Sequence, residues 1–364
     1  MSDGSPGRKP DGDHRGGDHR GGDHRGGDHR GGDPSRPVTI AYIAESAGVS
    51  VPTVSKVING RSGVSADTRA RVEDLVNRHK YRKPVAAHRS NVVELVFREL
   101  ESLWAVEIIR GVERVARKHR AGVLVSAFGL HDSTPAAWDD TVARRPHCVL
   151  SVAQLSAAER DELKAKGIPF VVFDPTGELP DDVPFVGATN WSGGRAATRH
   201  LLELGHRRIA MISGPDHVLC CRARQDGYRS AMEAAGLTAG PELLVHADLT
   251  REDGRAAAAR LLAGPERPTA IFASNDLQAL GVYQAARAAG LRIPEDLSVV
   301  GFDDLPVVAW VEPPLTTVHQ PLTEMAVAAT ELAMSLGRGE KAPQIGLEIA
   351  TTLTVRNSTA PPSG

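Results

Sequence analysis

One stretch near the N-terminus constrains the fold most, because capping, apolar and glycine residues recur in it at the spacing of two short helices. It covers residues 38–60, V-T-I-A-Y-I-A-E-S-A-G-V-S-V-P-T-V-S-K-V-I-N-G. Thr39 is a predicted N-cap, since its hydroxyl accepts a free backbone N–H. Gly48 is expected to stop the first helix by adopting left-handed angles. Ser50 would cap the second helix and Gly60 would end it. The pattern predicts a helix-turn-helix, whose second helix lies in the DNA major groove.

The two faces of the second predicted helix differ in chemistry. One face is apolar and is expected to be buried. The other carries Thr53, Ser55, Lys56 and Asn59, side chains long enough to reach base edges or phosphates. The alternative is that these residues form the solvated face of an ordinary helical hairpin.

A third helix is predicted over residues 62–80, with Ser65 as its N-cap.

The charge of the chain is unevenly distributed along the sequence. Residues 36–91 carry a net charge of +6, residues 1–35 carry −1 and the remainder carries −7. A basic module beside an acidic body is typical of a nucleic-acid-binding protein, although small helical units are also often basic by chance.

The order of small, apolar and polar residues from 38 to 81, including V-S-A-D-T-R-A-R-V and a tyrosine at 81, resembles the DNA-binding headpiece of the lac repressor family. The resemblance implies a set of DNA-facing residues: Thr39, Ser50, Val51, Pro52, Thr53, Ser55, Lys56, Asn59, Ser65 and Tyr81. Val51 and Pro52 occupy the two principal base-reading positions. Because neither side chain donates a hydrogen bond, we expect apolar contacts there, for instance with thymine methyl groups.

The connector after this headpiece departs from the family pattern. In the lac repressor family it commonly forms a hinge helix that presses a leucine into the minor groove and kinks the duplex. Here the connector is shorter and contains no leucine, and Val85 is its only sizeable apolar residue. We therefore expect the minor-groove wedge to be absent or poorly replaced, which puts DNA bending in doubt.

From residue 92 onward, short apolar runs alternate with amphipathic helices, which predicts parallel sheets with helices on both faces. Two series of runs predict two doubly wound subdomains with a ligand at the carboxyl ends of their strands. L-L-E-L-G-H-R-R-I-A-M-I-S-G-P and T-A-I-F-A-S-N-D resemble the same family's body, an α/β periplasmic-binding-protein-like sensor. By this resemblance the chain crosses between subdomains near residues 188, 317 and 345.

The sequence is thus divided into an N-terminal tail, an all-α helix-turn-helix headpiece, a connector, an effector-binding body and a C-terminal tail. The tail contains four D-H-R-G-G repeats, whose glycine-rich composition favours disorder. The predicted bounds are 1–35 for the disordered tail, 36–83 for the DNA-binding domain, 84–91 for the hinge, about 92–188 with 318–344 for subdomain 1, about 189–317 with 345–357 for subdomain 2, and 358–364 for a flexible tail.

Polar residues end or follow several predicted strands, where a doubly wound sheet places its ligand. By the resemblance, the effector-contacting positions are Asp174, Arg224, Asn275, Asp303 and Gln320, and Trp104 is placed for ring stacking on the ligand. Planar polar groups and aromatic rings are the groups that recognise sugars. Each carboxylate has an alternative role as a helix cap or in a strand-end turn, and Trp104 as a core residue.

Several classes of function are disfavoured by what the sequence lacks. The three cysteines form no C-x-x-C, so no disulfide framework or zinc site is expected, as in a reducing cytoplasm. We find no apolar run that would span a bilayer, and neither a nucleophile elbow, a zinc-protease motif nor a phosphate-binding loop. No cofactor is expected.

The favoured function is a cytoplasmic, DNA-binding transcription regulator, usually a repressor, controlled by a small sugar or related metabolite. Two-fold symmetry would pair a homodimer with a palindromic operator. The alternatives are a transport-type solute-binding protein and a regulator that has lost effector control.

Overall fold

The computed structural model describes two units of the chain. The described residues are 39–58, 61–79, 81, 90–98, 100, 103–128 and 135–363. They divide between Met1–Ala86, which contains the headpiece, and Ala87–Gly364, the body. None of the helices in these ranges has the length and apolar composition needed to cross a membrane.

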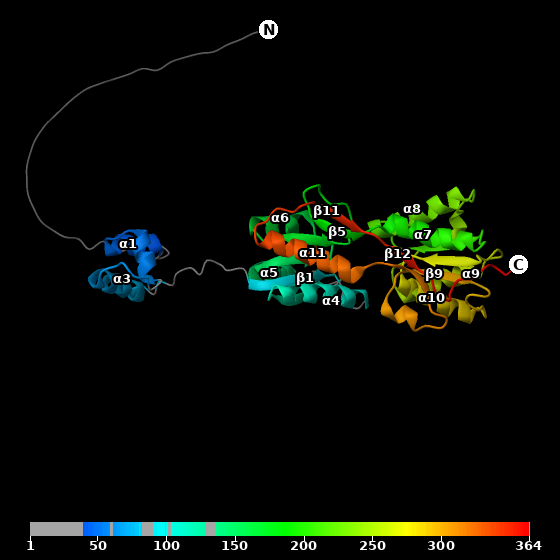
Figure 1. The fold of residues 1–364 in the computed structure, drawn as a ribbon, viewed down its shortest axis with the longest axis horizontal. Coiled ribbons are helices and arrows are strands. Elements are labelled where there is room, and N and C mark those ends of the chain that lie inside the picture. Colours follow the sequence, from blue (N-terminus) through cyan, green and yellow to red (C-terminus); the bar gives the residue numbers. More distant parts are fainter. Residues whose placement is uncertain are drawn as a thin grey trace, which may run out of the picture. The chain divides into compact units, whose positions relative to one another are not determined.

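The headpiece consists of three helices, α1 (Ile40–Ala47), α2 (Val51–Ile58) and α3 (Ala66–Arg78) (Figure 1). The Thr39 hydroxyl accepts the Tyr42 N–H at 3.2 Å, and Gly48 ends α1 at a φ of 64°. Ser65 caps α3 through the Thr68 N–H. These contacts confirm the predicted helix boundaries at the turn and at the start of α3.

The headpiece core forms where the apolar faces of the three helices meet. It contains Ile43, Val54 and Val72, all fully buried. Tyr81 is only 8% exposed and belongs to the same core. Its ring therefore stabilises the headpiece, and the contact with DNA that the resemblance implies for it stays a prediction. Asn59 and Gly60 lie outside the described residues.

The body contains two six-stranded sheets, which confirms the predicted pair of doubly wound subdomains (Figure 1). The first sheet has the order β11-β5-β4-β3-β1-β2 and the second β12-β10-β9-β8-β6-β7, with β12 antiparallel to β10. The strands of the first sheet are β1 (Ser90–Phe97), β2 (Gly122–Ala127), β3 (Pro146–Ser151), β4 (Phe170–Phe173), β5 (Phe185–Ala188) and β11 (Gly346–Ile349). Those of the second are β6 (Ile209–Ser213), β7 (Leu244–His246), β8 (Ala270–Ala273), β9 (Ser298–Asp303), β10 (Thr316–His319) and β12 (Thr352–Thr354).

Both sheets are covered by helices on both faces, because their strands bury alternate residues in two separate cores. In β3, for example, Cys148 and Leu150 belong to one core and Val149 to the other. The helices of the first subdomain are α4 (Leu103–Lys118), α5 (Pro135–Arg144), α6 (Ala157–Ala165) and α11 (Leu322–Gly337). Those of the second are α7 (Asn190–Glu203), α8 (Leu219–Ala234), α9 (Arg251–Leu262) and α10 (Asp276–Ala288), with short 3₁₀ turns η1 (Pro241–Leu243) and η2 (Pro306–Ala309).

The chain passes between the sheets three times: after β5, after β10 and after β11. The first crossing lies close to the predicted residue 188. The predicted third crossing near 345 was wrong, because β11 first pairs with β5 in the first sheet. The first and third crossings are bonded to each other, since the Thr351 N–H donates to the Thr189 hydroxyl at 2.9 Å and Thr189 N–H to the Ile349 carbonyl at 3.0 Å.

The C-terminal residues are packed against the second sheet, so the prediction of a flexible tail from 358 was wrong. Ser358 is fully buried; its hydroxyl accepts the Thr316 N–H at 2.8 Å and donates to the Val299 carbonyl at 2.6 Å. His206, whose pKa is lowered by burial, lies 2.9 Å from the Ala360 carbonyl. The tail is ordered because it satisfies backbone and side-chain groups that burial would otherwise leave unpaired.

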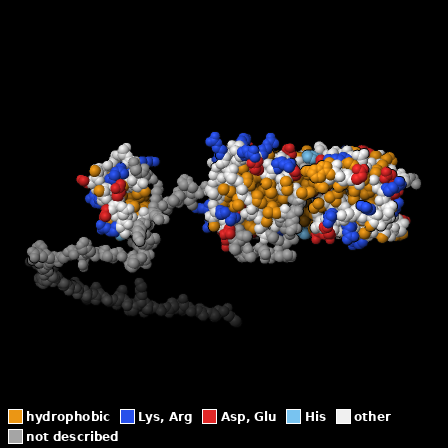
Figure 2. Space-filling model, turned by 90° about the horizontal axis from the view of Figure 1, so that it is seen from below, with side chains coloured by type: hydrophobic (Ala, Val, Ile, Leu, Met, Phe, Trp, Pro, Cys, Tyr) orange, Lys and Arg blue, Asp and Glu red, His pale blue; other side chains and the backbone are white. Residues whose placement is uncertain are grey.

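One face of the body, formed by α4 and α10, carries an apolar surface that extends over both subdomains (Figure 2). Leu103 and Val106 on α4 are 48% and 50% exposed, and Trp310, just after η2, is 81% exposed. Contiguous exposed apolar side chains of this size are typical of protein interfaces.

Candidate functional site

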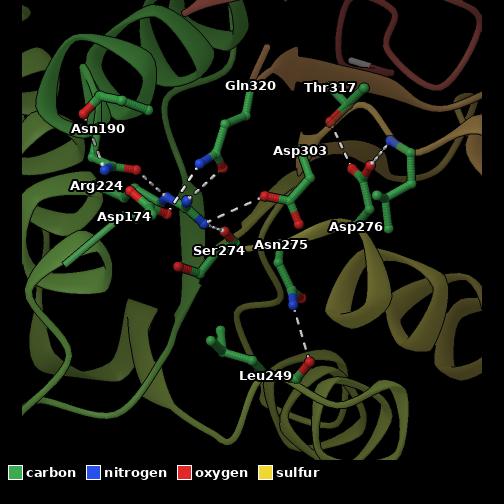
Figure 3. Close-up of polar contacts among 12 residues, drawn as sticks. Asp174, Asn190, Arg224, Leu249, Ser274, Asn275, Asp276, Asp303, Thr317 and Gln320 are labelled. Carbon is green, nitrogen blue, oxygen red and sulfur yellow. Dashed lines mark hydrogen bonds and ion pairs between the residues drawn. The ribbon is translucent and has the colours of Figure 1, made fainter. Parts of the chain in front are cut away.

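Five of the six predicted effector residues come from five different elements and lie where the strands of the two sheets end (Figure 3). Asp174 directly follows β4, Asn275 follows β8 by two residues, Asp303 ends β9 and Gln320 follows β10. Arg224 lies in the second turn of α8. The topology brings these ends together because parallel strands place all their carboxyl ends at the same edge of a sheet.

Arg224 is the centre of this cluster, and it is almost completely buried. Its Nε donates to Asn190 Oδ1 at 2.9 Å, Nη1 to the Ser274 carbonyl at 2.6 Å and Nη2 to Gln320 Oε1 at 3.2 Å. The guanidinium carbon lies 3.6 Å from the centroid of the Phe302 ring. Because a guanidinium is planar and its donors have fixed directions, these contacts fix the orientation of Arg224.

Gln320 joins the two subdomains. Its side-chain oxygen accepts from Arg224 of the second subdomain, and its Nε2 donates to Asp174 Oδ2 of the first at 3.0 Å. Gln320 itself lies at the second crossing, between β10 and α11. A hydroxyl-bearing ligand that replaced either contact would therefore act on both subdomains at once.

Asp303 brings a negative charge to the same cluster. Its Oδ1 lies 3.9 Å from Arg224 Nη1. Burial raises the pKa of Asp303 well above its usual value, and the nearby Arg224 charge opposes that shift. Asp303 and Asp174 both have positive φ angles, 111° and 44°. Such angles are costly for residues other than glycine and are retained preferentially at functional sites.

Asn275 has the alternative role that the sequence left open. Its Oδ1 accepts the Gln278 N–H at 2.8 Å as the N-cap of α10, and its Nδ2 donates to the Leu249 carbonyl at 3.0 Å. Its contact with an effector therefore stays a prediction.

Trp104 is half-buried and packs edge-to-face on Phe173, with ring centroids 5.8 Å apart. Trp104 therefore packs against the core of the first subdomain, and its stacking on an effector stays a prediction.

Two groups that bind Arg224 were not predicted from the sequence, namely Asn190 and the Ser274 carbonyl. A polar residue following the buried run F-V-G-A was the available signal for Asn190. The contact with the Ser274 carbonyl could not be predicted from residue type, because every residue has a backbone carbonyl.

A cavity of about 510 Å³ lies beside the cluster and is bordered by Asp174, Asn190, Trp191, Cys220 and Glu348, among others. It is large enough for a small ligand.

Asp276, the residue after Asn275, is fully buried and accepts two hydrogen bonds. Its carboxylate accepts the Thr317 hydroxyl at 2.6 Å and the Leu305 N–H at 2.8 Å. Burial raises the pKa of Asp276 to about 7, despite the opposing effect of these two hydrogen bonds. The folded protein therefore holds a proton that an unfolded carboxyl releases near pH 4.

We predict that Asp276→Asn removes part of the pH dependence of stability. Because the folded pKa is raised, the stabilisation is complete below pH 4 and is lost as the pH rises to about 7. The parent should lose up to about 3–4 kcal/mol across this window. Asparagine keeps both hydrogen bonds, since the Thr317 hydroxyl is able to reverse its role, but it does not titrate. Urea unfolding at several pH values measures this; an equal slope in the variant would contradict the prediction.

Apart from Tyr81, the described DNA-facing candidates of the headpiece lie on α2 and at the helix starts. Val51, Pro52 and Lys56 are exposed. The Ser50 hydroxyl lies 2.9 Å from the Thr53 hydroxyl and accepts the Thr53 N–H at 3.4 Å. The exposed surface of α2 thus presents two apolar side chains followed by one cation, the arrangement expected for apolar base contacts beside a phosphate contact.

Two sequence profiles match the chain. One, described as bacterial regulatory proteins of the lacI family, matches residues 39–83, and one for a periplasmic binding protein-like domain matches residues 198–359. The HTH-type transcriptional regulator DegA of Bacillus subtilis is 32% identical over 89% of this chain and 98% of its own length.

Similar solved structures include a complex of the transcriptional regulator CelR with cellobiose, with 33% identity, a TM-score of 0.69 and coverage of 89% of this chain and all of that one. The lac repressor dimer bound to operator and an anti-inducer has 27% identity, a TM-score of 0.66 and the same coverage.

Proposed function

Because this chain belongs to the lacI family of bacterial regulatory proteins, we propose that it binds operator DNA and is controlled by a small sugar bound between its two subdomains. The observation that carries the proposal is the set of contacts around Arg224 and Gln320, which unites both subdomains in one polar cluster. The protein acts in the cytoplasm, where its DNA is, and the site performs no catalytic step.

The chemistry of the cluster favours a neutral polyol. Asp174, Asp303 and Asn275 offer acceptors, Arg224 and Gln320 offer donors, and the aromatic rings nearby cover apolar C–H faces. Two carboxylates disfavour an anionic ligand such as a sugar phosphate. The adjoining cavity of about 510 Å³ has room for a mono- or disaccharide, and the relative CelR has been solved with cellobiose.

The effector would act by changing the angle between subdomains. Sugar hydroxyls that take over the contacts of Gln320 with Asp174 and Arg224 would favour one closure angle over another. In a homodimer joined through the apolar face of α4 and Trp310, this rotation changes the spacing of two headpieces on a palindromic operator. A coupling of about 1–3 kcal/mol is enough for such control.

Two measurements on the full-length chain test the proposal. Selection from a pool of random duplexes should enrich an inverted repeat. A thermal-shift screen with cellobiose, ribose and other neutral sugars should give a hit, since ligand at a hundredfold excess over Kd stabilises the protein by about 2.7 kcal/mol. A sugar hit without an enriched duplex would support a transport-type binding protein instead. An enriched duplex without a hit would indicate a regulator that has lost effector control.

We predict that Lys56→Ala weakens binding to the selected duplex roughly tenfold in about 100 mM salt, because one phosphate contact is lost. Fluorescence anisotropy at fixed salt measures the Kd. Arg78→Ala is a matched control on α3, since its guanidinium pairs with Asp74 at 2.6 Å, and it should bind nearly as well as the parent. Unchanged affinity of Lys56→Ala would place that side chain away from the DNA.

A further inference from the structure

Two arginines at helix ends adopt backbone angles that normally require glycine. Arg120 follows α4 and has a φ of 55°, and Arg145 follows α5 and has a φ of 47°. Both lie in the left-handed region, which costs a residue with a Cβ about 1–2 kcal/mol. At the same position after a helix, glycine is the usual residue because it adopts these angles without strain.

Elsewhere in the body the chain does use glycine at this position. Five helix ends with positive φ carry glycine: Gly167, Gly205, Gly236, Gly290 and Gly339. Among the left-handed helix ends of the body that the structure describes, Arg120 and Arg145 are thus the two that carry arginine in place of glycine. Strain that persists where a relaxed residue is available points to a role other than folding.

The two arginines flank the point where the chain arrives from the headpiece. The Ser90 N–H, at the start of β1, donates to the Arg145 carbonyl at 2.9 Å, and Asn91 Nδ2 donates to the Arg120 carbonyl at 2.7 Å. Only eight residues separate Tyr81 from Ser90 in the sequence. A chain of this length spans at most about 30 Å, so the start of β1 is tethered within about that distance of Tyr81 in the headpiece.

The surroundings of the two arginines are basic, although the body as a whole is acidic. We define the connector end as the segments that lead into the other strands of the first sheet: 117–121, 144–145, 164–169, 180–184 and 338–345. These segments contain nine Lys or Arg and three Asp or Glu, a net charge of +6, whereas residues 92–364 together carry −7. Figure 2 shows Lys and Arg side chains gathered over this end of the first subdomain.

Several cations of the connector end are neutralised by neighbours, but the two strained arginines are not. Arg117, Lys118 and Arg144 pair with Glu113, Glu331 and Glu94 respectively. Among the residues that the structure describes, no ion pair engages Arg120 or Arg145. Their charges remain available to an external anion.

We propose that Arg120 and Arg145 bind phosphates of the DNA that the headpiece holds, so that the connector end contacts the duplex directly. The inference rests on the proposed function and deepens it. The connector here is short and lacks the leucine that the family uses as a wedge. Contacts between two cations of each body and the phosphate backbone would replace part of the affinity that the wedge supplies elsewhere.

The test is the double variant Arg120→Gly, Arg145→Gly in the full-length chain, with a mixed-sequence duplex about 40 base pairs long as the probe, since phosphate contacts are sequence-independent. The variant should lose about eightfold in affinity per contact in about 100 mM salt, and the slope of log Kd against log salt should fall by about 0.9 per contact. Its Tm should equal or exceed that of the parent, because glycine relieves the backbone strain.

Two controls separate charge from structure. Arg120→Lys, Arg145→Lys keeps both charges at the strained positions and should bind like the parent. Arg255→Gln, Arg260→Gln removes two exposed charges from α9 of the second subdomain and should also leave the salt slope unchanged. A glycine variant that binds like the parent overturns the inference, and so does a lysine variant that is as weak as the glycine variant. If the parent itself binds no duplex, the proposed function has failed instead.

Discussion

Arg224→Ala is expected to abolish the response to effector and to lower the free energy of unfolding by about 3–5 kcal/mol. The guanidinium donates to Asn190, the Ser274 carbonyl and Gln320, and its Nη1 lies 3.9 Å from Oδ1 of the buried Asp303 carboxylate. Removing it leaves these acceptors without a donor and the Asp303 charge without compensation. Isothermal titration with the sugar found by screening, together with urea unfolding, measures both effects.

The loss of stability in Arg224→Ala should depend on pH. Burial raises the pKa of Asp303, and without Arg224 that pKa rises further. In both proteins the raised carboxyl pKa destabilises the fold as the pH rises above the unfolded value near 4, so the additional deficit of the variant appears only once the pH exceeds the raised pKa of Asp303 in the parent, and it grows with increasing pH from there. Adding Asp303→Asn should recover part of the stability but not the effector response. A normal effector response in Arg224→Ala would refute its role in the site.

Gly194→Ala is expected to destabilise the second subdomain by about 3 kcal/mol or more and to weaken effector binding at least tenfold. Helices α7 and α8 pack so closely that a Cβ on Gly194 would lie 2.2 Å from the Arg224 carbonyl oxygen and 2.8 Å from its Cα. Because the clashing atoms belong to the backbone of α8, a change of side-chain rotamer cannot relieve the clash. The two helices must therefore move apart, and Arg224 moves with α8. Thermal unfolding and sugar titration of the variant measure the two consequences.

The chain offers a matched control for this variant. Helices α9 and α10 cross through glycines in the same manner, and a Cβ on Gly281 would lie 2.3 Å from the Arg251 carbonyl oxygen. Gly281→Ala should therefore destabilise the subdomain to a similar degree without displacing Arg224, and the folded variant should keep its sugar affinity. Equal sugar affinity in Gly194→Ala and Gly281→Ala would contradict the idea that the α7–α8 crossing positions Arg224.

The elements that the sequence predicted well are those with strong local signals. The helix-turn-helix has caps and glycines at fixed spacing, and the buried strands of both sheets are dense in β-branched residues. Helix α5 and the strands β5, β10, β11 and β12 were not predicted. β11 and β12 are short and partly exposed, and pairing with β5 and β10, rather than composition, makes them strands. Tertiary contacts of this kind leave little trace in a local pattern.

The site was also predicted in part: four of its residues were expected, but the roles of others were not. The resemblance brought Asp174, Arg224, Asp303 and Gln320 to one place, and the structure joins them. It did not predict that Asn275 caps α10, nor that the next residue, Asp276, is a fully buried carboxyl. These roles depend on which of the two side chains points into the protein at the start of α10, and a local sequence pattern does not show this. The packed C-terminal segment escaped prediction for the same reason, since its proline-rich sequence is typical of tails whereas its partners lie far away in the sequence.

The three crossings also determine when each part of the protein is complete during synthesis. The first sheet needs β11 and the second needs β12, and both follow all the other strands in the chain. Neither subdomain therefore has all its strands until residues 346–354 have left the ribosome, whereas the headpiece is finished once Tyr81 has emerged. A chain interrupted early would carry a complete DNA-binding module with no sensor to control it, and a chain interrupted late would lack an edge of both sheets at once.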